Sequence, residues 1–361
     1  MKKGDLDELR DKIDKLDEKL VRTLNQRAQL GVRIASIKAA SGAPIYYPAR
    51  ENEILKKVAS LNPGPLSAEA LQSVFREIFS ATRSVEKRMK IACLGPAGSF
   101  SHLATLKMFG ANSDCSLEQG IDRVFKAVES GAADMGVAPI ENSIEGAVGQ
   151  TMDSFMNSPV KIHAEYFYRI HLNLLSREEK PEGIKTIYSQ YMPLGQCRGW
   201  LARHMPNVKV VETSSTAEAA IRAAGEPGSA AIGAKEAAQM YGLGILARNI
   251  EDRAGNQTRF LAISLDGAPR PGADKTSIVF STRHTAGALY KVLSQFAEKK
   301  INLCGIQSRP NPTREWEYVF FVDFTGSLDS AAVSAAMKKI EPHTIFLKPL
   351  GSYPASLPAG Q

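Results

Sequence analysis

The sequence predicts a chain of three parts with different fold classes: an all-α helical domain at residues 1–90, an α/β domain at residues 91–266 and an α+β domain at residues 275–350. Three observations lead to this prediction. Apolar residues recur with helical spacing in the first part, short apolar strands alternate with helices from Lys90 onward, and the order of elements changes again after a linker rich in proline and glycine. Residues 351–361 are predicted to be a disordered tail.

The composition excludes several classes of protein. Of the 361 residues, 43% are hydrophobic and 23% charged, which is ordinary for a globular protein. The chain has no apolar run of about 18 residues and its N-terminus is too polar for a signal peptide, so we expect a cytoplasmic protein without a membrane segment. The four cysteines form no C-x-x-C pair and the six histidines lack metal-ligand spacing. We therefore expect reduced thiols, no metal and no cofactor.

The net charge of +7 raises the question of a nucleic-acid partner. The basic residues alternate with acidic ones and form no patch interspersed with aromatic residues, so we expect no nucleic-acid binding. Such a charge most often reflects helices whose charged side chains are solvated. The more specific alternative is that the positive charge binds a small anionic ligand.

Residues 5–40 are predicted to form one long helix because they contain no proline and their apolar residues recur in steps of three and four. The stripe begins with Leu9, Ile13, Leu16, Leu20 and Leu24 and continues through Arg27, Gly31, Ile34 and Lys38. Two cations thus lie on the face expected to be buried, where each must find an anion. A helix of this length spans roughly 50 Å, more than a small domain can cover. We therefore expect it to pack against a second copy of itself.

Two further helices are predicted, one beginning near Pro48 and one after Ser67 as N-cap. Thr82 and Glu86 interrupt the apolar stripe of the second. Any one such residue could lie at the edge of a stripe. Four interruptions on two helices favour a polar site instead.

These segments resemble a known family. LRDKIDKLDEKLVRTLNQR, then Lys38, then ARENEIL are similar to the all-helical chorismate mutases, over about residues 5–90. The resemblance implies a chorismate site with Arg10, Arg27 and Arg50 at the two carboxylates, Lys38 at the ether oxygen and Glu51 at the ring hydroxyl. The implied reaction is pericyclic and needs no nucleophile, so catalysis must come from holding the reactive conformer and stabilising charge on the ether oxygen.

Arg10 lies about 80 to 100° around the helix from Arg27 and Lys38. It could therefore serve the site of a partner subunit, as the intertwined dimer of the family implies; we expect a homodimer or a dimer of dimers. Glu86 stands where glutamine is frequent in the family. Because only a protonated carboxyl can donate a hydrogen bond to the ether oxygen, the mutase is expected to work better below neutral pH. Tyr47 stands where an acidic residue is frequent.

From Lys90 onward, the alternation of strands and helices predicts largely parallel sheets. Four motifs, GPAGSFSH, GVAPIENSIEGAV, SSTAEAA and NQTRF, together resemble the prephenate dehydratases, over about residues 91–266. The family implies two α/β lobes, similar to periplasmic binding proteins, with the active site in the cleft between them.

The resemblance assigns Thr258 to the departing hydroxyl group of prephenate, Arg259 to a carboxylate and Phe260 to an apolar wall. It implies further polar contacts from Ser99, Asn142, Ser143, Ser189 and Gln196. The alternative that Thr258 is an ordinary strand residue and Arg259 a structural ion-pair partner at a lobe hinge stays open. Gln190 and Tyr191 depart from the histidine and proline usual in the family.

After the linker at residues 267–274, the predicted order is βαββαβ, a ferredoxin-like layer. GALYKVL followed by NLCGIQSRP resembles the ACT regulatory domain, which implies phenylalanine as an inhibitor bound between two such domains. The implied contacts are Gly287, Ala288, Leu289, Asn302, Leu303, Ser308, Arg309 and Pro310. Gln307 replaces the usual glutamate, which leaves the strength of feedback open.

Two functions of different classes follow from these patterns. One is a bifunctional enzyme that turns chorismate into phenylpyruvate through prephenate, and the other is a sensor without catalytic activity. Thr258 with Arg259, and the cations within the first helical stripe, favour the enzyme. The number of subunits, transfer of prephenate between sites and use of arogenate stay open.

Overall fold

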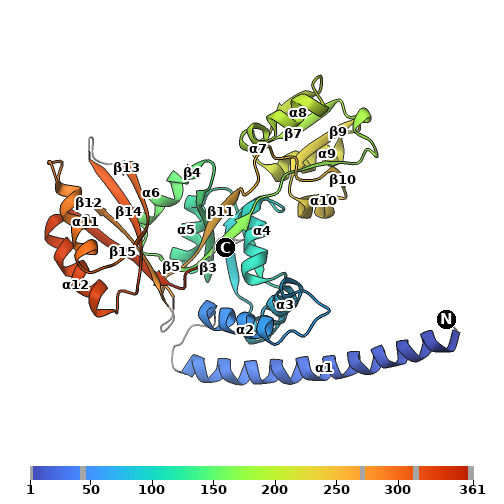
Figure 1. Ribbon diagram of the computed structural model, residues 1–361, viewed down its shortest axis with the longest axis horizontal. Helices are drawn as coiled ribbons and strands as arrows, with labels where there is room; N and C mark the ends of the chain where they lie inside the picture. The colour runs from blue at the N-terminus through green and yellow to red at the C-terminus, as the bar shows by residue number, and fades with distance from the viewer. Residues whose placement is uncertain (1–2, 41–45, 269–272, 312–316, 357–361) are drawn as a thin grey trace. The chain divides into compact units, whose positions relative to one another are not determined.

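The computed structural model describes residues 3–40, 46–268, 273–311 and 317–356 (Figure 1). The chain divides into two compact units. One comprises Met1–Met89 with Phe109–Asp114, and the other comprises Lys90–Met108 with Cys115–Gln361. Among the described residues, no helix is long and apolar enough to cross a bilayer, and the cytoplasmic location stays a prediction.

The first unit is helical, as predicted. Its helices are α1 (Lys3–Ala40), α2 (Pro48–Ser60) and α3 (Ala68–Glu86). Proline occupies the first turn of α2, where its missing N–H costs no helical hydrogen bond. The Ser67 side chain accepts a hydrogen bond from Ala70 N at 3.1 Å, which confirms its predicted role as N-cap of α3.

Helix α1 continues well beyond the part that contacts α3 (Figure 1). The apolar side chains of its N-terminal half are more than half exposed at Leu9, Ile13, Leu16 and Leu20. Such a continuous apolar stripe on one side of a helix is typical of an interface between subunits. The predicted packing of α1 against a second copy stays a prediction.

The second unit begins with an α/β lobe, called here the first lobe. Its strands are β1 (Lys90–Leu94), β2 (Asp114–Glu118), β3 (Met135–Asn142), β4 (Gly146–Ala147), β5 (Lys161–Arg169) and β11 (Gln257–Ser264). Its helices are α4 (Phe100–Phe109), α5 (Ile121–Glu129) and α6 (Gly149–Asn157). The sheet order is β2-β1-β3-β11-β5, with β4 beside β3.

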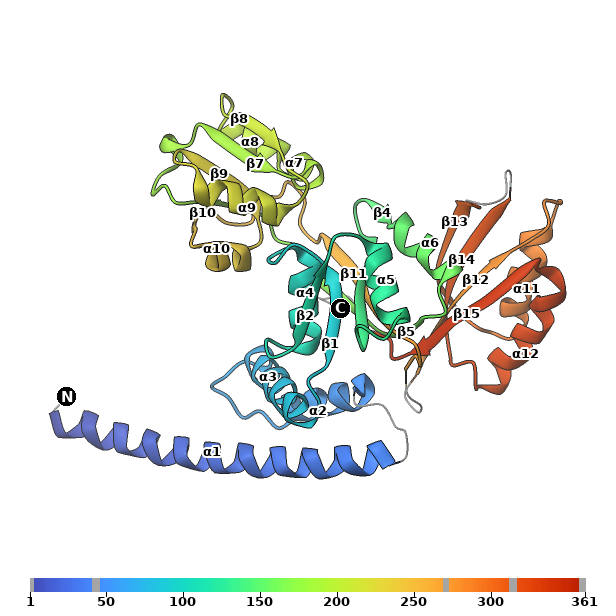
Figure 2. The same cartoon turned by 180° about the vertical axis from the view of Figure 1, so that it is seen from behind.

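The second lobe lies between β5 and β11 in the sequence. Its strands are β6 (Asn173–Ser176), β7 (Thr186–Ser189), β8 (Lys209–Glu212), β9 (Ser229–Gly233) and β10 (Gly244–Ala247), in the order β10-β6-β9-β7-β8. Its helices are η1 (Pro181–Gly183), α7 (Tyr191–Gln196), α8 (Arg198–His204), α9 (Thr216–Gly225) and α10 (Lys235–Tyr241), and α9 and α10 pack next to each other (Figure 2).

The prediction of largely parallel sheets is wrong. In the first lobe β1 and β3 are parallel, but β11 is antiparallel to both β3 and β5. In the second lobe β7 is parallel to β8 and β9, whereas β6 is antiparallel to β9 and β10. The reason is that the chain leaves the first lobe after β5 and returns as β11, which inserts between two existing strands. Periodicity within a strand does not reveal such an insertion.

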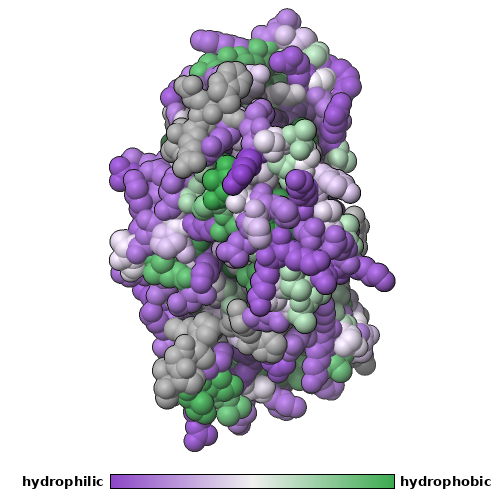
Figure 3. Space-filling view, turned by 90° about the vertical axis from the view of Figure 1, so that its left-hand side faces the viewer, coloured by the Kyte–Doolittle hydropathy of each residue, from purple (hydrophilic) through white to green (hydrophobic). Residues whose placement is uncertain are grey.

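The C-terminal part, residues 275–353, has the predicted βαββαβ order. Its elements are β12 (Lys275–Ser281), α11 (Ala288–Glu298), β13 (Leu303–Pro310), β14 (Tyr318–Thr325), α12 (Ala331–Ile340), η2 (Glu341–His343) and β15 (Phe346–Tyr353). The sheet order is β13-β14-β12-β15, with antiparallel pairs throughout. Helices α11 and α12 lie side by side and cover one face. On the side that lies to the left in Figure 1, the surface is largely hydrophilic, with separate hydrophobic areas (Figure 3).

The prediction of a disordered tail at residues 351–356 and beyond, to residue 361, is wrong for residues 351–356. Strand β15 extends to Tyr353, which is fully buried, and Ser356 N donates to Glu165 Oε1 at 2.9 Å. The prediction rested on the position of this segment at the end of the sequence. The sequence could not show that Glu165, far away in the chain, would accept a hydrogen bond from the backbone of this segment. Residues 357–361 lie outside the described residues.

Candidate active sites

A cavity of about 290 Å³ lies among the three helices of the first unit. It brings together all the predicted mutase residues except Arg10, namely Arg27, Lys38, Arg50, Glu51, Thr82 and Glu86. Other lining residues include Ile34, Tyr47, Ile54 and Phe79. The cavity thus combines four cations, since Arg83 also lines it, with two carboxylates and an apolar wall. Such a combination suits a small dianion with a hydrophobic ring.

Arg27 connects α1 to α3 across this cavity. Its Nη1 donates to Thr82 Oγ1 at 3.0 Å, and its guanidinium lies over the Phe79 ring at 5.2 Å from the centroid. Burial lowers the pKa of Arg27, and the charges of Glu51 and Glu86 oppose that effect. The predicted anions thus act on Arg27 through their charge, whereas its direct contacts are a hydroxyl group and an aromatic ring.

Lys38 and Glu86 face the same cavity. Burial raises the pKa of Glu86 above the ordinary value of a glutamate, while the charges of Lys38, Arg83 and Arg27 lower it. Lys38 Nζ lies over the Tyr47 ring at 5.6 Å from its centroid. Gly31 allows α1 and α3 to approach here, because a Cβ at this position would lie 2.5 Å from Thr82 Cγ2 and 2.9 Å from Glu86 Oε1.

Arg83 lines the cavity but was missed in the sequence. It is 9% exposed, forms an ion pair with Glu51 and donates from Nη2 to Phe109 O at 2.8 Å. Burial raises the pKa of Glu51, whereas the charge and hydrogen bond of Arg83 lower it. The available signal was spacing, since Arg83 follows the buried Phe79 by four residues and so shares its face of α3.

Arg10 lies outside this cavity. It precedes Arg27 by 17 positions on the continuous helix α1, which corresponds to about 25 Å along the axis. Its Nη1 lies 3.4 Å from Asp7 Oδ1 in an exposed pair. The predicted role of Arg10 in the site of a partner subunit stays a prediction.

In the second unit, a chain of polar side chains links the two lobes. Asn142 Nδ2 on β3 donates to Thr258 Oγ1 on β11 at 2.9 Å and to Asn256 Oδ1 at 2.8 Å. Asn256 Nδ2 in turn donates to Gln196 Oε1 of the second lobe at 2.8 Å. The structure therefore brings together Thr258, Asn142 and Gln196, as the resemblance implies. Asn256 was missed, although it is the first residue of the quoted NQTRF motif.

The amide of Asn142 is held in one orientation. Its Oδ1 accepts hydrogen bonds from Ile144 N at 2.9 Å and from Glu145 N at 3.0 Å, so its Nδ2 must be the atom that faces Thr258. Because Thr258 Oγ1 accepts that hydrogen bond, the proton of its own hydroxyl remains available for a different acceptor.

The three predicted serines have backbone partners. Ser99 Oγ donates to Leu94 O at 3.1 Å, Ser143 Oγ accepts from Gln257 N at 3.0 Å, and Ser189 Oγ donates to Gln190 O at 3.0 Å. Ser99 and Ser189 are buried. These contacts hold the turns after β1, β3 and β7, and substrate contacts by the serines stay predictions.

Arg259 does not face the Asn142 amide as Thr258 does. Successive side chains of a strand point to opposite faces, so two neighbours on β11 cannot both face the Asn142 amide. Arg259 Nε donates to Glu165 Oε2 at 2.7 Å, Nη2 donates to Tyr353 OH at 2.9 Å, and Nη1 pairs with Asp323. The guanidinium is thus held by protein groups, as the structural ion-pair alternative implies, and its contact with a carboxylate of prephenate stays a prediction.

Phe260 is also placed differently from the prediction. It is 1% exposed and pairs across the sheet with Pro139 and Tyr166. It fills the core beneath β11 and does not form an open wall. A phenylalanine in a strand of the sequence FLAIS is compatible with either position, because the whole segment is apolar.

The predicted effector residues lie at three places in the C-terminal part. Gly287, with a φ of +76°, precedes α11, whose first residues are Ala288 and Leu289. Asn302 and Leu303 lie at the start of β13, and Ser308, Arg309 and Pro310 lie at its end. Arg309 Nη2 donates to Asp153 Oδ2 on α6 at 2.8 Å, so its side chain contacts the first lobe.

The four cysteines are free, and no group of three or more potential metal ligands occurs among the residues that the structure describes.

Comparison with known proteins identifies two family models in this chain. The model described as chorismate mutase type II matches residues 9–87, and the model described as prephenate dehydratase matches residues 91–268. The first match covers the helices around the cavity, and the second covers both lobes with the Asn142 and Thr258 pair.

Full-length relatives and solved structures agree with these models. The chain is 44% identical over 357 residues to the bifunctional chorismate mutase/prephenate dehydratase of Aquifex aeolicus (strain VF5), covering 98% of this chain and 99% of the relative. It is 43% identical over 355 residues to that of Stutzerimonas stutzeri, covering 97% of each. A crystal structure of prephenate dehydratase from Arthrobacter aurescens in complex with L-Phe superimposes with a TM-score of 0.68 at 33% identity, covering 75% of this chain and 92% of that one. This chain therefore belongs to the family of bifunctional chorismate mutase/prephenate dehydratases.

Proposed function

We infer that the chain catalyses two consecutive reactions of phenylalanine biosynthesis: the rearrangement of chorismate to prephenate, and the decarboxylating dehydration of prephenate to phenylpyruvate. Both family models in one chain, with relatives similar over nearly the whole length, support this function. The observation that carries it is the cavity in which Lys38 and Glu86 face Arg27 and Arg50.

The mutase cavity suits a reaction without a nucleophile. We propose that Arg27 and Arg50 hold the two carboxylates of chorismate and that Glu51 contacts the ring hydroxyl. Lys38 and the protonated carboxyl of Glu86 donate to the ether oxygen as its bond breaks, and Thr82 keeps Arg27 in position. These donors are fixed before the reaction begins, so little free energy is lost in reorganising them.

For the dehydratase, we propose that the hydroxyl of Thr258 donates its proton toward the ring hydroxyl that leaves prephenate. The ring carboxylate departs as carbon dioxide, its bonding electrons enter the ring, and the leaving hydroxyl takes up a proton to become water. Asn142 supports this role because its amide occupies a lone pair of Thr258 Oγ1 and thereby directs the hydroxyl proton elsewhere. Asn256 and Gln196 extend the same polar chain to the second lobe.

A coupled assay tests both activities together. Purified protein supplied with chorismate should form phenylpyruvate, measured by its ultraviolet absorbance, and supplied prephenate should give the same product without the first step. A sensor without catalytic activity would bind these acids but leave both unchanged. Accumulation of prephenate from chorismate would show the mutase alone.

The C-terminal part is proposed to be an ACT-type regulatory domain that binds phenylalanine. Its ferredoxin-like order supports this role, as does the L-Phe bound by the related dehydratase from Arthrobacter aurescens. Two copies would face each other near Gly287 and Asn302, so the proposed assembly is a homodimer or a dimer of dimers. The apolar stripe of α1 supplies a second contact between copies.

Phenylalanine added to the full chain should lower dehydratase turnover, because it favours a less active arrangement. Asn302→Ala removes a side chain proposed to contact the effector, and should raise the concentration needed for half inhibition about tenfold. Initial rates at a series of phenylalanine concentrations measure this effect. Lys338→Ala, on the exposed face of α12, is the control and should leave inhibition unchanged. Equal sensitivity of the Asn302 variant would place the effector elsewhere.

Glu86→Gln should flatten the decline of mutase activity with rising pH. The pKa of Glu86 is raised by burial, so the protonated donor persists above the ordinary range of a carboxyl and is lost as pH rises through that raised value. Glutamine keeps an N–H donor at every pH. Mutase rates across the pH range measure the difference, and an unchanged profile would show that another group titrates.

A further inference from the structure

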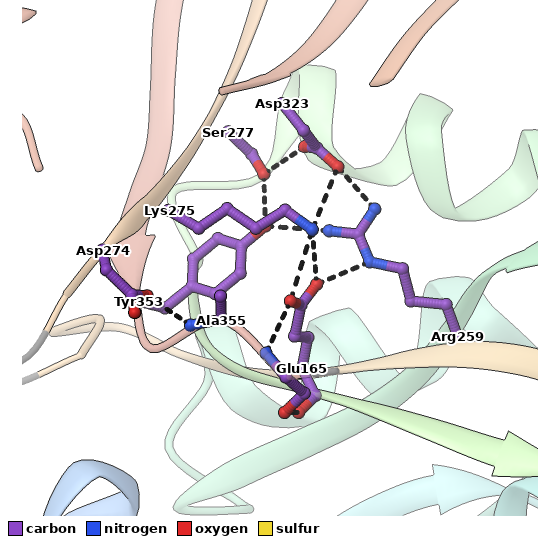
Figure 4. A network of polar contacts seen from close by, with 9 residues as sticks. Glu165, Arg259, Asp274, Lys275, Ser277, Asp323, Tyr353 and Ala355 are labelled. Atoms are coloured by element: carbon purple, nitrogen blue, oxygen red, sulfur yellow. Dashed lines mark hydrogen bonds and ion pairs between the residues drawn. The ribbon is translucent and has the colours of Figure 1, made fainter. Parts of the chain in front are cut away.

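A buried cluster of charges joins the first lobe to the C-terminal part (Figure 4). Glu165 on β5 is at its centre with a side chain that is 0% exposed, and it pairs with both Arg259 on β11 and Lys275 on β12. Asp323 on β14 pairs with the same two cations. Two cations and two anions therefore neutralise one another at a largely buried junction. The cluster is intact only when the lobe and the C-terminal part are together.

Arg259 is held from both sides of this junction. One of its partners, Glu165, belongs to the first lobe, whereas Asp323 and Tyr353 belong to the C-terminal part. Ser277 on β12 links these two, because it hydrogen-bonds to Asp323 Oδ1 and lies 2.6 Å from Tyr353 OH. All three nitrogens of the guanidinium thus have fixed partners. The position of Arg259 depends on the C-terminal sheet as much as on its own.

The pairing of β11 with β3 is irregular beside Arg259. The pairing of β11 with β3 runs from Thr258 opposite Asn142 to Arg259 opposite Glu141, and then shifts so that Phe260 lies opposite Pro139. Ile140 has no opposite residue and forms a bulge. This bulge bends β3 next to Asn142. On β11, one peptide bond joins Arg259 to Thr258, so forces on the Arg259 side chain act on the backbone that carries Thr258.

We propose that Arg259 is a positioning residue for Thr258 and that Asp323 of the C-terminal sheet, through Arg259, fixes Thr258 against the Asn142 amide. The proposal rests on the proposed function of Thr258 in dehydration. Through this contact the C-terminal part contributes to the basal geometry of the dehydratase site. A movement of β14 relative to β11 changes the direction of the Thr258 hydroxyl without any contact between the effector and the substrate.

A double-mutant cycle tests this proposal. Asp323→Asn keeps the size of the side chain but removes the charge that holds Arg259, and should lower kcat for prephenate about tenfold with KM changed less than about twofold. In a chain that already carries Thr258→Val, the same change should have no further effect on kcat, because the group that it positions is gone. Multiplicative losses in the double variant would overturn the proposal.

Further variants separate positioning from general loss of structure. Tyr353→Phe removes one hydrogen bond to Arg259 at nearly constant volume, and should show a smaller loss of kcat with the same dependence on Thr258. Lys348→Met is the matched control: Lys348 also joins the C-terminal sheet to the first lobe, but its ammonium donates to Phe155 O of α6 at 2.7 Å and not to Arg259 or its partners. It should leave kcat unchanged. A loss of kcat in Lys348→Met equal to that in Asp323→Asn would overturn the proposal.

The far-ultraviolet circular dichroism and the unfolding temperature of each variant, measured on the same preparation, report whether the unit that carries Thr258 and Asp323 is folded. Normal kcat in Thr258→Val would refute the function of Thr258 and the proposal with it. A low kcat in Thr258→Val together with normal kcat in both Asp323→Asn and Tyr353→Phe would refute the positioning alone. The two failures are thereby distinguished.

Discussion

Lys38→Ala should lower the rate of chorismate rearrangement roughly 100-fold or more, the scale for removing one preorganised donor to a transition state. The ammonium group lines the same cavity as Arg27 and Glu86, on the part of α1 that approaches α3 at Gly31. Substrate binding should suffer less, since the charge on the ether oxygen develops only as the bond breaks. Chorismate consumption at saturating substrate measures the effect.

Two controls accompany this variant. Dehydration of supplied prephenate should be unchanged in Lys38→Ala, because that reaction is assigned to different residues in the other compact unit. Lys56→Ala, at an exposed position of α2 that does not line the cavity, should rearrange chorismate at the normal rate. If Lys38→Ala also did so, the assignment of this helix face would be wrong.

Thr258→Val should lower dehydratase turnover by about two orders of magnitude. Valine keeps the β-branched shape that suits a strand but has no hydroxyl, so it removes the proposed donor and leaves the amide of Asn142 without this acceptor. Because the hydroxyl acts mainly on the leaving group, KM for prephenate should change much less than kcat. Phenylpyruvate formation from supplied prephenate measures both.

Thr258→Ser is the control variant for Thr258→Val. It restores a hydroxyl at the same Cβ and should recover most of the turnover lost in the valine variant, whereas chorismate rearrangement should be normal in both. A serine variant as slow as the valine variant would argue that packing of the methyl group, and not the hydroxyl, is what matters. Normal turnover in Thr258→Val would make Thr258 an ordinary strand residue.

The sequence predicted the helical site well because helical periodicity carries information about three dimensions. Arg27 and Lys38 occupy positions of an apolar stripe, so they had to face α2 and α3 together with Thr82 and Glu86. The same reasoning failed for Arg83, since a cation in the last turn of α3 is equally compatible with a helix terminus facing water.

The β-sheet sites were harder to predict, because the partners of a strand residue are set by topology. Arg259 pairs with Glu165 and Asp323, which lie 94 and 64 positions away in the sequence. The resemblance correctly grouped Thr258 with Asn142, but alternation along β11 separates Arg259 from both. That alternation could have been applied to NQTRF in the sequence, and it would have favoured the ion-pair alternative.

The position of β11 also determines the order in which the dehydratase can fold during synthesis. All five strands of the second lobe are contiguous in the chain, so this lobe can form as soon as β10 has left the ribosome. The first lobe cannot, because β3 and β5 are neighbours of β11 and lack that strand until Gln257–Ser264 emerges. Long-range pairing of this kind forms late and slowly. The strand that carries Thr258 thus completes its own sheet last, after the inserted lobe has been made.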